Sequence, residues 1–539
     1  MNKILTYKKM NMKKISKILA LSLLVAVFSS CSQDEFEIPQ KGVLELESFY
    51  ANADDDDAIS AMMAIYKTIY TGLRGSNWYV SMNARTNDCV AGSDFADSDA
   101  LQQFSNYNMV TTNTTVNSMY QSYYQIIYWC NLLIENVAAE SNVKRQIIAE
   151  AKAIRAFCHF DLIRLWGTPV KVDRVLTAAE AAELTNTPAA ETWALVEQDL
   201  NEAISGLPSK AGIGGQAVIG GRLTAEAAKF LLGKAQLYQG KNAEAAATLR
   251  QIITSGLYDL GPIADLYRPA ADFGPEYLWE FNSADGTSNI AAQGDMREAF
   301  WGWRADNVDS DGAGLVRATW GFGAPTAIFA NFLLSYDGGK SDRWKAYIAD
   351  FEDILEMGST GVWSPPVSNC EGYFRLLRVA REEDLYEHTY AWAASARSKA
   401  NQAWIRYSEV LLLYAEAQLA ANGDSDGSGL EALNKTRTRS GLSALGSYNM
   451  QELKDEKRAE LFFEGERFFD LVRWGDCATE LADKGRTWYS FYGYASGTTN
   501  WDVRSQPGPG TGWNDKYKLL PFPYNEMLAN PNMVQNPGW

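Results

Sequence analysis

The sequence predicts a mostly α-helical protein in which paired helices pack against a half that is rich in loops. Three observations support this fold class. Apolar residues recur at helical spacing along several stretches of the chain. Residues 222–258 read as two helices joined by a short turn. Residues 261–399 lose this periodicity and are rich in Gly, Asp, Ser and aromatic side chains; a long irregular segment in an ordered chain is usually functional.

The N-terminus has the features of a bacterial lipoprotein signal. Residues 1–30 contain six lysines and no acidic residue, and their apolar run, 18–28, is too short to span a bilayer. Two serines precede Cys31, so that residues 27–31 form a lipobox. We expect cleavage before Cys31, a lipid on that residue as the membrane anchor, and a flexible tether over residues 31–45. The alternative is an ordinary secretory signal followed by an incidental cysteine.

The mature chain is acidic and unusually aromatic. Removing residues 1–30 changes the formal net charge from −17 to −23, whichever of Met1, Met10 and Met12 is the true start. So negative a protein repels nucleic acid and anionic lipid headgroups, which leaves the lipid to hold it at the membrane. Aromatic residues make up 12% of the chain, with 17 tryptophans, which excludes a disordered chain or a coiled coil.

The number and spacing of the cysteines and histidines do not favour a metal site or a catalytic site. Besides Cys31 the chain has five cysteines, an odd number with no C-x-x-C pair, so we expect no disulfide framework. The two histidines, His159 and His388, lie far apart in the sequence, which disfavours a His-based zinc site or a catalytic triad. His159 lies one position off the apolar face of its helix and is expected to be structural. We expect no catalytic residue, no metal and no cofactor.

The expected helices form one domain over residues 46–539. The first follows Asp54–Asp57, whose carboxylates suit the positive N-terminus of a helix; a metal site is the alternative interpretation. Within residues 222–258, Gly233 and Ala245 are small enough to let two helices approach closely, as in a tetratricopeptide pair. A single pair cannot bury its own face, so we expect similar helices elsewhere within residues 46–260 and 403–475. The candidates are residues 119–139, 145–166 and 403–420.

Residues 455–474 read as one amphipathic helix. Leu461, Phe468 and Val472 lie on its apolar face, and charged residues lie beside that face at a spacing of three. We expect two ion pairs within the helix, Glu464 with Arg467 and Asp470 with Arg473.

Five strings, in the expected order, resemble motifs of the SusD/RagB family. They are AEAKAIRAFCHFDLIRLWGTP (149–169), GRLTAEAAKFLLGKAQLYQG (221–240), LNKTRTRSGL (433–442), EKRAELFFEGERFFDLVRWG (456–475) and LLPFPYNEMLANPNMVQNPGW (519–539). Together they extend over nearly the whole mature chain, and five ordered motifs are far more specific than one. The acidic stretch 32–37 is similar to the signal that directs lipoproteins of Bacteroidetes to the outer face of the outer membrane.

The resemblance implies binding and not catalysis. Members of the family are surface lipoproteins that bind a nutrient, usually a glycan, and sit as a lid over a SusC-type TonB-dependent transporter in the outer membrane. Their tetratricopeptide-type helix pairs face the transporter, and a more irregular half carries the ligand site. The resemblance therefore implies that residues 261–399 belong to the ligand-binding half.

Sugar recognition requires flat apolar platforms together with amide, carboxylate and guanidinium groups. We expect the following ligand-binding residues: Trp301, Trp303, Arg304, Asp306, Asn307, Trp320, Trp78, Tyr79, Asn87 and Asp88. Aromatic residues in a Gly/Ser/Thr-rich stretch near the C-terminus could also rim a site or contact the transporter: Tyr492, Tyr494 and Trp501. Tryptophans within helical or apolar patterns are assigned to the core: Trp166, Trp279, Trp404 and Trp474.

Two other functions remain open at this stage. A surface glycoside hydrolase uses the same aromatic and carboxylate side chains, although no short motif marks a catalytic carboxylate pair. Capture of peptides instead of glycans is the second alternative. The sequence does not identify the glycan.

Overall fold

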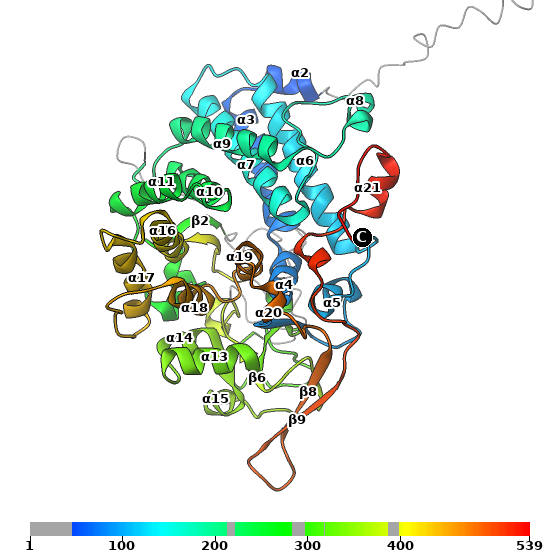
Figure 1. Ribbon diagram of the computed structural model, residues 1–539, viewed down its shortest axis with the longest axis vertical. Coiled ribbons are helices and arrows are strands. Elements are labelled where there is room, and N and C mark those ends of the chain that lie inside the picture. The colour runs from blue at the N-terminus through cyan, green and yellow to red at the C-terminus, as the bar shows by residue number, and fades with distance from the viewer. Residues whose placement is uncertain (1–45, 213–220, 283–296, 317–318, 386–397) are drawn as a thin grey trace, which may run out of the picture. The chain divides into compact units, whose positions relative to one another are not determined.

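The architecture is mostly helical and is seen in a computed structural model of the chain (Figure 1). The structure describes residues 46–212, 221–282, 297–316, 319–385 and 398–539. The signal expected over residues 1–30, the tether expected over residues 31–45 and the lipidation site Cys31 lie outside the described residues. Tyr50–Trp539 form one compact unit.

Helices dominate the first half of the described chain. They are α2 (Leu46–Ala51), α3 (Asp55–Thr68), α4 (Ser76–Ala84), α5 (Asp99–Asn106), α6 (Thr114–Asn136), α7 (Asn142–Trp166), α8 (Ala178–Glu183), α9 (Ala189–Gly206), α10 (Ala225–Tyr238) and α11 (Asn242–Thr254). A π-helical turn, η2 (Ile69–Leu73), extends α3. Among the described residues, no helix combines the length and the apolar character needed to cross a membrane.

Shorter helices and small sheets follow. The helices are α12 (Arg297–Trp301), α13 (Ala327–Asp337), α14 (Asp342–Tyr347), α15 (Phe351–Glu356), α16 (Tyr407–Asn422), α17 (Ser428–Arg439), α18 (Met450–Glu460), α19 (Arg467–Trp474), α20 (Cys477–Glu480) and α21 (Tyr524–Ala529). The strands are β1 (Cys89–Gly92), β2 (Tyr277–Phe281), β3 (Phe322–Pro325), β4 (Ile348–Asp350), β5 (Val367–Ser368), β6 (Tyr373–Arg375), β7 (Gln402–Arg406), β8 (Thr487–Tyr494) and β9 (Trp501–Pro507). All pairings are antiparallel: β1 with β3, β2 with β7, β4 with β6, and β5–β8–β9.

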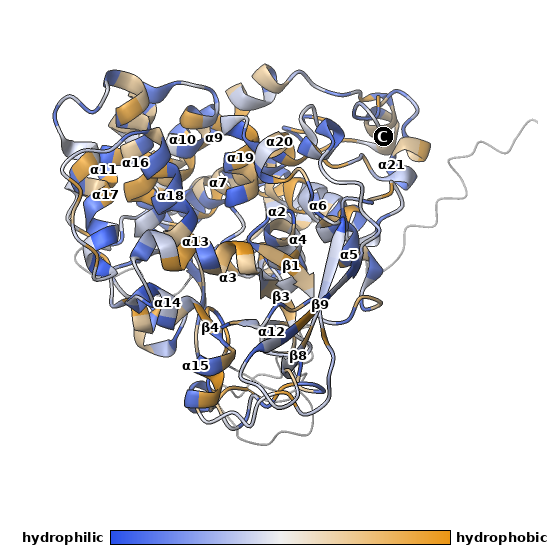
Figure 2. Cartoon of the chain, turned by 60° about the horizontal axis from the view of Figure 1, so that its bottom comes forward, coloured by the Kyte–Doolittle hydropathy of each residue, from blue (hydrophilic) through white to orange (hydrophobic). Residues whose placement is uncertain are grey.

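The predicted helix pair in residues 222–258 is confirmed as α10 and α11. A Cβ added at Gly233 would lie 2.7 Å from the Cγ atom of Leu249, so only glycine permits the two helices to approach this closely. Further helices pack in succession, α6 on α7, α7 on α9, α9 on α10, α11 on α16 and α16 on α17. Hydrophobic and hydrophilic residues alternate along these helices, as is expected where one face of each is buried (Figure 2).

Local capping and packing confirm two sequence predictions. Asp54 caps α3: its carboxylate accepts a hydrogen bond from the backbone N–H of Asp57, and the Asp57 carboxylate accepts one from the backbone N–H of Asp54. The acidic run therefore caps the helix. His159 is fully buried in α7, where Nδ1 contacts the Arg155 carbonyl oxygen and Nε2 accepts from the Val172 N–H. Burial lowers the pKa of His159 to about 4, so its ring is neutral and structural at neutral pH.

The helix predicted over residues 455–474 is two helices instead of one. Residues 461–466 separate α18 from α19, because Phe463 and Gly465 have φ angles of 59° and 85°, which no α-helix contains. A Cβ on Gly465 would lie 2.5 Å from the indole ring of Trp78, so the break brings the backbone against that buried tryptophan. The helical spacing of the side chains did not reveal this break.

One of the two ion pairs predicted within this segment is confirmed. Arg473 Nη2 lies 2.8 Å from Asp470 Oδ1. The pair between Glu464 and Arg467 is wrong, because the break between α18 and α19 sends the two side chains to different partners. Glu464 accepts a hydrogen bond from Arg406, and Arg467 Nε lies 2.7 Å from Asp88 Oδ2.

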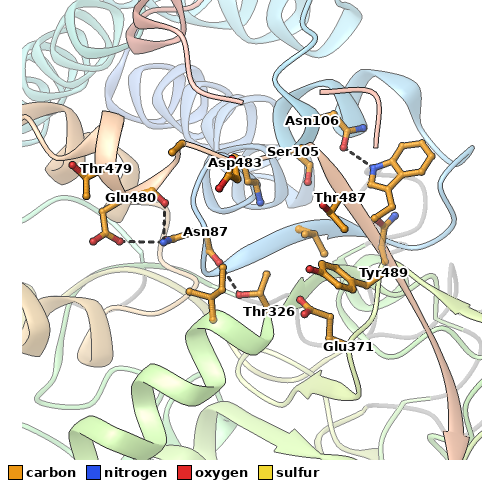
Figure 3. A pocket seen from close by; sticks show the side chains of 17 residues that line it. Asn87, Ser105, Asn106, Thr326, Glu371, Thr479, Glu480, Asp483, Thr487 and Tyr489 are labelled. Atoms are coloured by element: carbon orange, nitrogen blue, oxygen red, sulfur yellow. Dashed lines mark hydrogen bonds between the residues drawn. The ribbon is translucent and has the colours of Figure 1, made fainter. Parts of the chain in front are cut away.

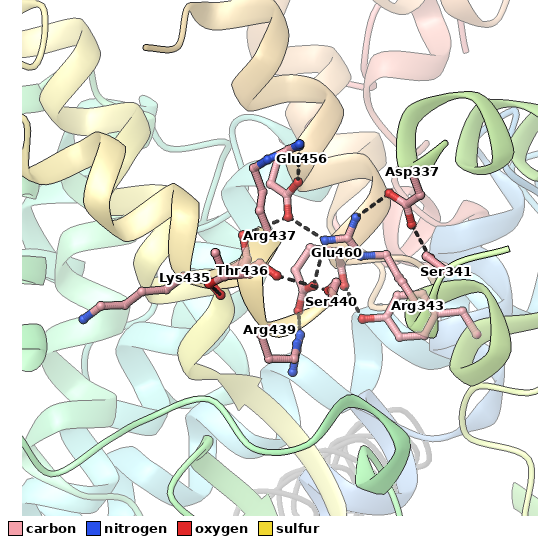
Figure 4. Close-up of polar contacts among 12 residues, drawn as sticks. Asp337, Ser341, Arg343, Lys435, Thr436, Arg437, Arg439, Ser440, Glu456 and Glu460 are labelled. Carbon is pink, nitrogen blue, oxygen red and sulfur yellow. Dashed lines mark hydrogen bonds and ion pairs between the residues drawn. The ribbon is translucent and has the colours of Figure 1, made fainter. Parts of the chain in front are cut away.

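A buried ionic network centred on Glu460 joins α18 to α14 and α17 (Figure 4) and, through Arg406, to β7. The Glu460 carboxylate contacts Arg439, lies 3.2 Å from Arg406 Nη1, and lies 3.4 Å from Arg343 Nη2. Arg343 also binds Glu456 at 2.6 Å, and the side chains of Arg343, Glu456 and Glu460 are all completely buried. Removing one member of such a buried network leaves its partners charged and unpaired.

Other charged residues within residues 456–475 also bind other elements of the fold through ion pairs. Each charged side chain reaches an oppositely charged group on another helix or loop: Glu466 with Arg164 and Lys234, Lys457 with Glu416, Arg458 with Asp88, and Arg473 with Glu416. The segment 456–475 therefore links α7, α10, α16 and the start of β1 through buried charges.

We predict that Glu460→Gln destabilises the protein by about 3–5 kcal/mol, because three buried arginines lose their shared carboxylate. The free energy of unfolding is measured by urea denaturation. The matched control is Glu140→Gln, which breaks an exposed pair with Lys144 and is expected to cost less than about 0.5 kcal/mol. Equal effects of the two changes would contradict the role of the network.

The difference between wild type and Glu460→Gln is also expected to depend on pH. Burial raises the pKa of Glu460, but the attraction of Arg439, Arg406 and Arg343 outweighs burial and lowers that pKa to about 2. A depressed carboxyl pKa contributes stability above the unfolded pKa, about 4.3, which is lost as the pH falls toward 2. The unfolding free energies of the two proteins should therefore converge as the pH is lowered from 7 toward 3. A difference that stays constant over this range would show that Glu460 does not titrate as described.

Candidate ligand-binding site

A cavity of about 260 Å³ lies between the loop after α4, the start of α13 and the segment from α20 into β8 (Figure 3). Figure 3 shows Thr479 and Glu480 on one side and Asn106, Thr487 and Tyr489 on the other. The residues that line it are Asn87, Val90, Ser105, Asn106, Thr326, Ile328, Asn369, Glu371, Thr479, Glu480, Ala482, Asp483, Lys484, Gly485, Thr487, Trp488 and Tyr489. We call this the first cavity.

Neutral hydrogen-bonding groups make up much of its wall. Asn87 donates from Nδ2 to the Glu480 carbonyl oxygen at 3.0 Å and to Glu480 Oε2 at 3.1 Å. The Asn87 Oδ1 atom is buried and has no hydrogen-bond partner among the described residues. Thr326 donates to the Asn87 carbonyl oxygen at 2.6 Å, which fixes the backbone below the side chain. The acceptor capacity of this atom is therefore unused, although the atom is shielded from solvent.

Two aromatic side chains from β8 form the opposite wall. The Trp488 ring stacks on Phe95 with centroids 4.3 Å apart and planes 8° from parallel, and its Nε1–H donates to Asn106 Oδ1 at 2.9 Å. Tyr489 is 37% exposed and offers a platform for a ligand ring. Gly485 secures this geometry, because its φ is 79° and an added Cβ would lie 2.3 Å from the Asn106 carbonyl oxygen.

Charged groups complete the cavity. Burial raises the pKa of Glu371, whose Oε1 accepts a hydrogen bond from the Ala327 N–H at 3.2 Å. Burial lowers the pKa of Lys484 to about 8, and its Nζ donates to the Cys89 carbonyl oxygen at 2.6 Å. Tyr489 has a raised pKa because it is partly desolvated and lies near Glu371. The wall therefore combines donors, acceptors and an aromatic ring, the kinds of groups that suit a polyhydroxylated ligand.

Among the residues expected from the sequence, Asn87 is the one that lines the first cavity. The neighbouring Asp88 is buried and forms ion pairs with Arg458 and Arg467, so its carboxylate is used within the protein. Trp78 and Tyr79 in α4 are also buried, with exposures of 2% and 1%. Their indole and phenol rings contact each other and the core, which leaves no face for a sugar ring.

Trp301 and Trp303 were expected to bind the ligand, but both side chains are buried. The two side chains are 4% and 3% exposed. The Trp303 Nε1–H donates to the Arg375 carbonyl oxygen at 2.9 Å, and its ring packs on Phe374. Gly302 does not open a space between them, because Thr319 lies where a side chain would be. Trp320 is half-buried against Phe300 at 5.0 Å.

The other three expected residues lie together on the surface. Arg304 donates to Ser93 Oγ at 2.6 Å and contacts Asp97, and the exposed Asp306 carboxylate lies 3.8 Å from its guanidinium group. Asn307 donates to the Pro366 carbonyl oxygen at 3.1 Å. The Asn307 carbonyl oxygen accepts from the backbone N–H of Trp363, whose side chain is 58% exposed.

This surface is joined to the first cavity by one loop. Phe95, which stacks on Trp488, lies two residues from Asp97, which contacts Arg304. Sequence reasoning missed Trp363, Trp488 and Tyr489. The aromatic run in residues 488–494 was a signal for the last two, since the same stretch supplied Tyr492 and Tyr494 as candidates for the rim of a site.

Two family profiles match separate parts of the chain. Residues 357–539 match the profile described as the SusD family, and residues 46–233 match the profile described as "Starch-binding associating with outer membrane". "SusD-like protein P25" of Formosa agariphila is 23% identical over 97% of this chain and 98% of its own length. "Starch-binding protein SusD" of Bacteroides thetaiotaomicron is 30% identical over 25% of this chain and 21% of its own length.

Solved structures show the same fold over nearly the whole chain. A "Laminarin binding SusD-like protein" is 27% identical and superposes with a TM-score of 0.72. The match covers 90% of this chain and 99% of that protein's chain. "Surface glycan-binding protein A" from Bacteroides fluxus is 21% identical, with a TM-score of 0.71 over 90% and 100% of the two chains. The two profiles, the full-length relatives and the shared mostly helical fold agree, and the chain belongs to the SusD/RagB family.

Proposed function

We propose that this protein is a cell-surface glycan-binding lipoprotein that captures an oligosaccharide or polysaccharide and delivers it to a SusC-type TonB-dependent transporter. In this proposal the protein binds its ligand without catalysis. The lipid on Cys31 anchors it to the outer membrane, and residues 31–45 form the tether.

The composition of the first cavity carries the proposal. Its wall contains neutral amide and hydroxyl side chains, among them Asn87, Asn106 and Thr487, together with the exposed Tyr489 ring. Sugar hydroxyl groups pair with amides and carboxylates, and the C–H face of a pyranose ring packs on an aromatic ring. A volume of about 260 Å³ suits one or two sugar units, so a longer chain must extend beyond the cavity.

The neighbouring surface provides a path for the rest of a longer glycan. We propose that Arg304, Asp306 and Asn307 contact it there, next to the exposed Trp363 ring. Phe95 and Trp488 lie between this surface and the first cavity. Several weak contacts of this kind add up to useful affinity, since each stacked ring contributes about 1 kcal/mol.

The names of relatives support a glycan as the ligand and a place at the outer membrane. One structural relative is described as laminarin-binding and another as a surface glycan-binding protein. The profile that matches residues 46–233 is described as starch-binding and associated with the outer membrane. Laminarin and starch are therefore the first two glycans to test, ahead of a wider polysaccharide panel.

The test is affinity electrophoresis and calorimetry of the purified mature protein with the panel, followed by an assay for reducing ends. We expect retardation by at least one glycan without release of products. New reducing ends would favour a glycoside hydrolase, and binding to peptides but to no glycan would favour peptide capture; either result would contradict the proposal.

We predict that Tyr489→Ala weakens glycan binding about fivefold to tenfold, which corresponds to about 1–1.4 kcal/mol for one lost stacking platform. Tyr494→Ala is the matched control, because Tyr494 lies on the same strand and is 39% exposed, against 37% for Tyr489, but does not line the first cavity. Calorimetry measures both dissociation constants. Wild-type affinity in both variants, or an equal loss in both, would place the glycan elsewhere.

Replacing the anchor should separate location from binding. Cys31→Ala is expected to abolish retention at the cell surface, because no lipid can be attached there, while the affinity for glycan stays within about twofold of wild type. Surface protein is measured by protease accessibility of whole cells, and affinity by calorimetry of the released protein. Retention at the surface without Cys31 would refute the anchoring mechanism.

A further inference from the structure

A second cavity, of about 600 Å³, lies on a different part of the molecule. It is formed by the 3₁₀ turn η3 (Ile263–Asp265) and the residues after it, by α14, β4 and α15, and by the segment that follows β6. Its lining residues are Ile263, Ala264, Leu266, Tyr267, Arg268, Ala313, Leu315, Lys340, Trp344, Lys345, Ala346, Ile348, Ala349, Asp353, Glu356, Met357, Leu376, Arg378, Val379 and Arg381. The volume is within the range of small-molecule sites, about 300–1,000 Å³.

The chemistry of the second cavity differs from that of the first. Its lining contains no Ser, Thr, Asn or Gln, whereas the first cavity contains several of these residues. Apart from the Tyr267 hydroxyl and the Trp344 indole, every polar side chain in the wall is charged. The remaining wall is aliphatic or aromatic. Such a wall lacks the neutral donors and acceptors that recognise sugar hydroxyl groups, and it favours a ligand with an apolar body and a charge.

Three of its five basic residues already have carboxylate partners. Arg268 binds Asp384, with Nε 3.1 Å from Oδ2. Lys340 Nζ lies 2.6 Å from Asp350 and 2.7 Å from Asp353. Lys345 lies 3.4 Å from Asp342. These charges are neutralised within the protein and contribute little net attraction for a ligand.

Among the described residues, no carboxylate lies within ion-pair distance of Arg378, although Glu464 is near enough to interact with it electrostatically. Its side chain is buried, with the residue 8% exposed, and the guanidinium group stacks 3.6 Å from the Tyr267 ring centroid. Nη2 donates to the Ala403 carbonyl oxygen at 3.2 Å, and Nε is buried without any acceptor. A guanidinium group has five N–H donors, so most of them are unused here. Burial lowers the pKa of Arg378, but Tyr267, Tyr79 and Glu464 outweigh burial and raise it, so the guanidinium group is charged while most of its donors are unused.

Arg381 is a second guanidinium group outside ion-pair distance of a carboxylate, although Asp384, Glu383 and Asp265 are near enough to interact with it electrostatically. In the part of the chain that the structure describes, no ion pair or side-chain hydrogen bond involves it. Partial desolvation and the nearby Arg268 lower its pKa, although the group remains charged. Two unpaired arginines in the wall of one cavity are unusual in a chain whose formal net charge is −17.

We propose that the second cavity binds an amphipathic organic carboxylate. The carboxylate pairs with the buried guanidinium group of Arg378, while Arg381 at the exposed edge adds positive potential that attracts the anion. The apolar body of the ligand lies along Leu266, Leu315 and Val379. A bidentate contact between a guanidinium group and a carboxylate is strong in a desolvated site. This site is independent of the proposed glycan site.

The probe is 2-naphthoate, compared with its neutral isostere 2-naphthamide, by calorimetry on the intact mature protein. We expect saturable one-to-one binding of 2-naphthoate that is at least tenfold tighter than that of 2-naphthamide. Equal affinity of the two compounds would overturn the role of the arginines. Tighter binding of D-glucuronate than of 2-naphthoate would overturn the apolar character of the ligand.

Variants locate the site. Arg378→Met replaces an unpaired buried charge by an apolar chain of similar length, so it should fold and should reduce the preference for 2-naphthoate over 2-naphthamide to less than twofold. Arg381→Gln at the exposed edge should weaken 2-naphthoate binding severalfold. The matched control is Arg504→Gln, an exposed arginine on β9 that lines neither cavity and should not change the affinity. Wild-type binding in both Arg378→Met and Arg381→Gln would refute the proposal.

One further comparison separates this inference from the proposed glycan function. Tyr489→Ala is expected to leave 2-naphthoate binding unchanged, because Tyr489 lines only the first cavity. If glycan binding fails while 2-naphthoate still binds through Arg378, the proposed function is wrong and the second site stands. If 2-naphthoate binding falls in Tyr489→Ala, the second site is wrong.

Discussion

The fold depends on buried charge pairs that radiate from residues 456–475. Glu460 lies among three arginines from different elements, and Glu466 binds Arg164 and Lys234 from two further helices. Such pairs contribute little net stability, because desolvation offsets most of the attraction, but a wrong arrangement would leave charges buried and unpaired. The network therefore acts mainly by penalising alternative packings of α7, α10, α14, α16 and α17. This explains why the most distinctive string of the sequence is rich in Glu and Arg although it lies in the interior.

Much of the helical architecture could be predicted because helices and close helix pairs leave local signals. Gly233 at a helix contact, Asp54 at a helix start and the apolar stripe of α7 are each readable from a few neighbouring residues. The break between α18 and α19 was not readable in this way. It depends on Trp78, almost four hundred residues earlier, which occupies the space where a side chain at position 465 would lie. Pairings such as Glu464 with Arg406 are non-local for the same reason.

The binding site was less predictable, because exposure of an aromatic ring is a property of tertiary packing. Trp301 and Trp303 flank a glycine, yet Thr319 and Arg375 enclose them. Tyr489 shows no stronger local pattern than these two tryptophans, and its ring is exposed because β8 carries it along the edge of a cavity. Asn87 was identified because it lies in a polar loop between helices, where side chains usually remain accessible.

The contrast between the two cavities bears on how one protein could discriminate among ligands. A strongly acidic surface repels anions at long range, so a free carboxylate gains entry only where local positive charge outweighs that field. The second cavity supplies this charge through Arg378 and Arg381, whereas the first cavity has three carboxylates, Glu371, Glu480 and Asp483, against the single cation Lys484. The first cavity should therefore favour uncharged sugars over uronic acids, since its carboxylates outnumber its one cation, Lys484, which already donates to the Cys89 carbonyl oxygen. The selectivity of each cavity for charged or uncharged ligands would then follow from the balance of acidic and basic side chains that line it.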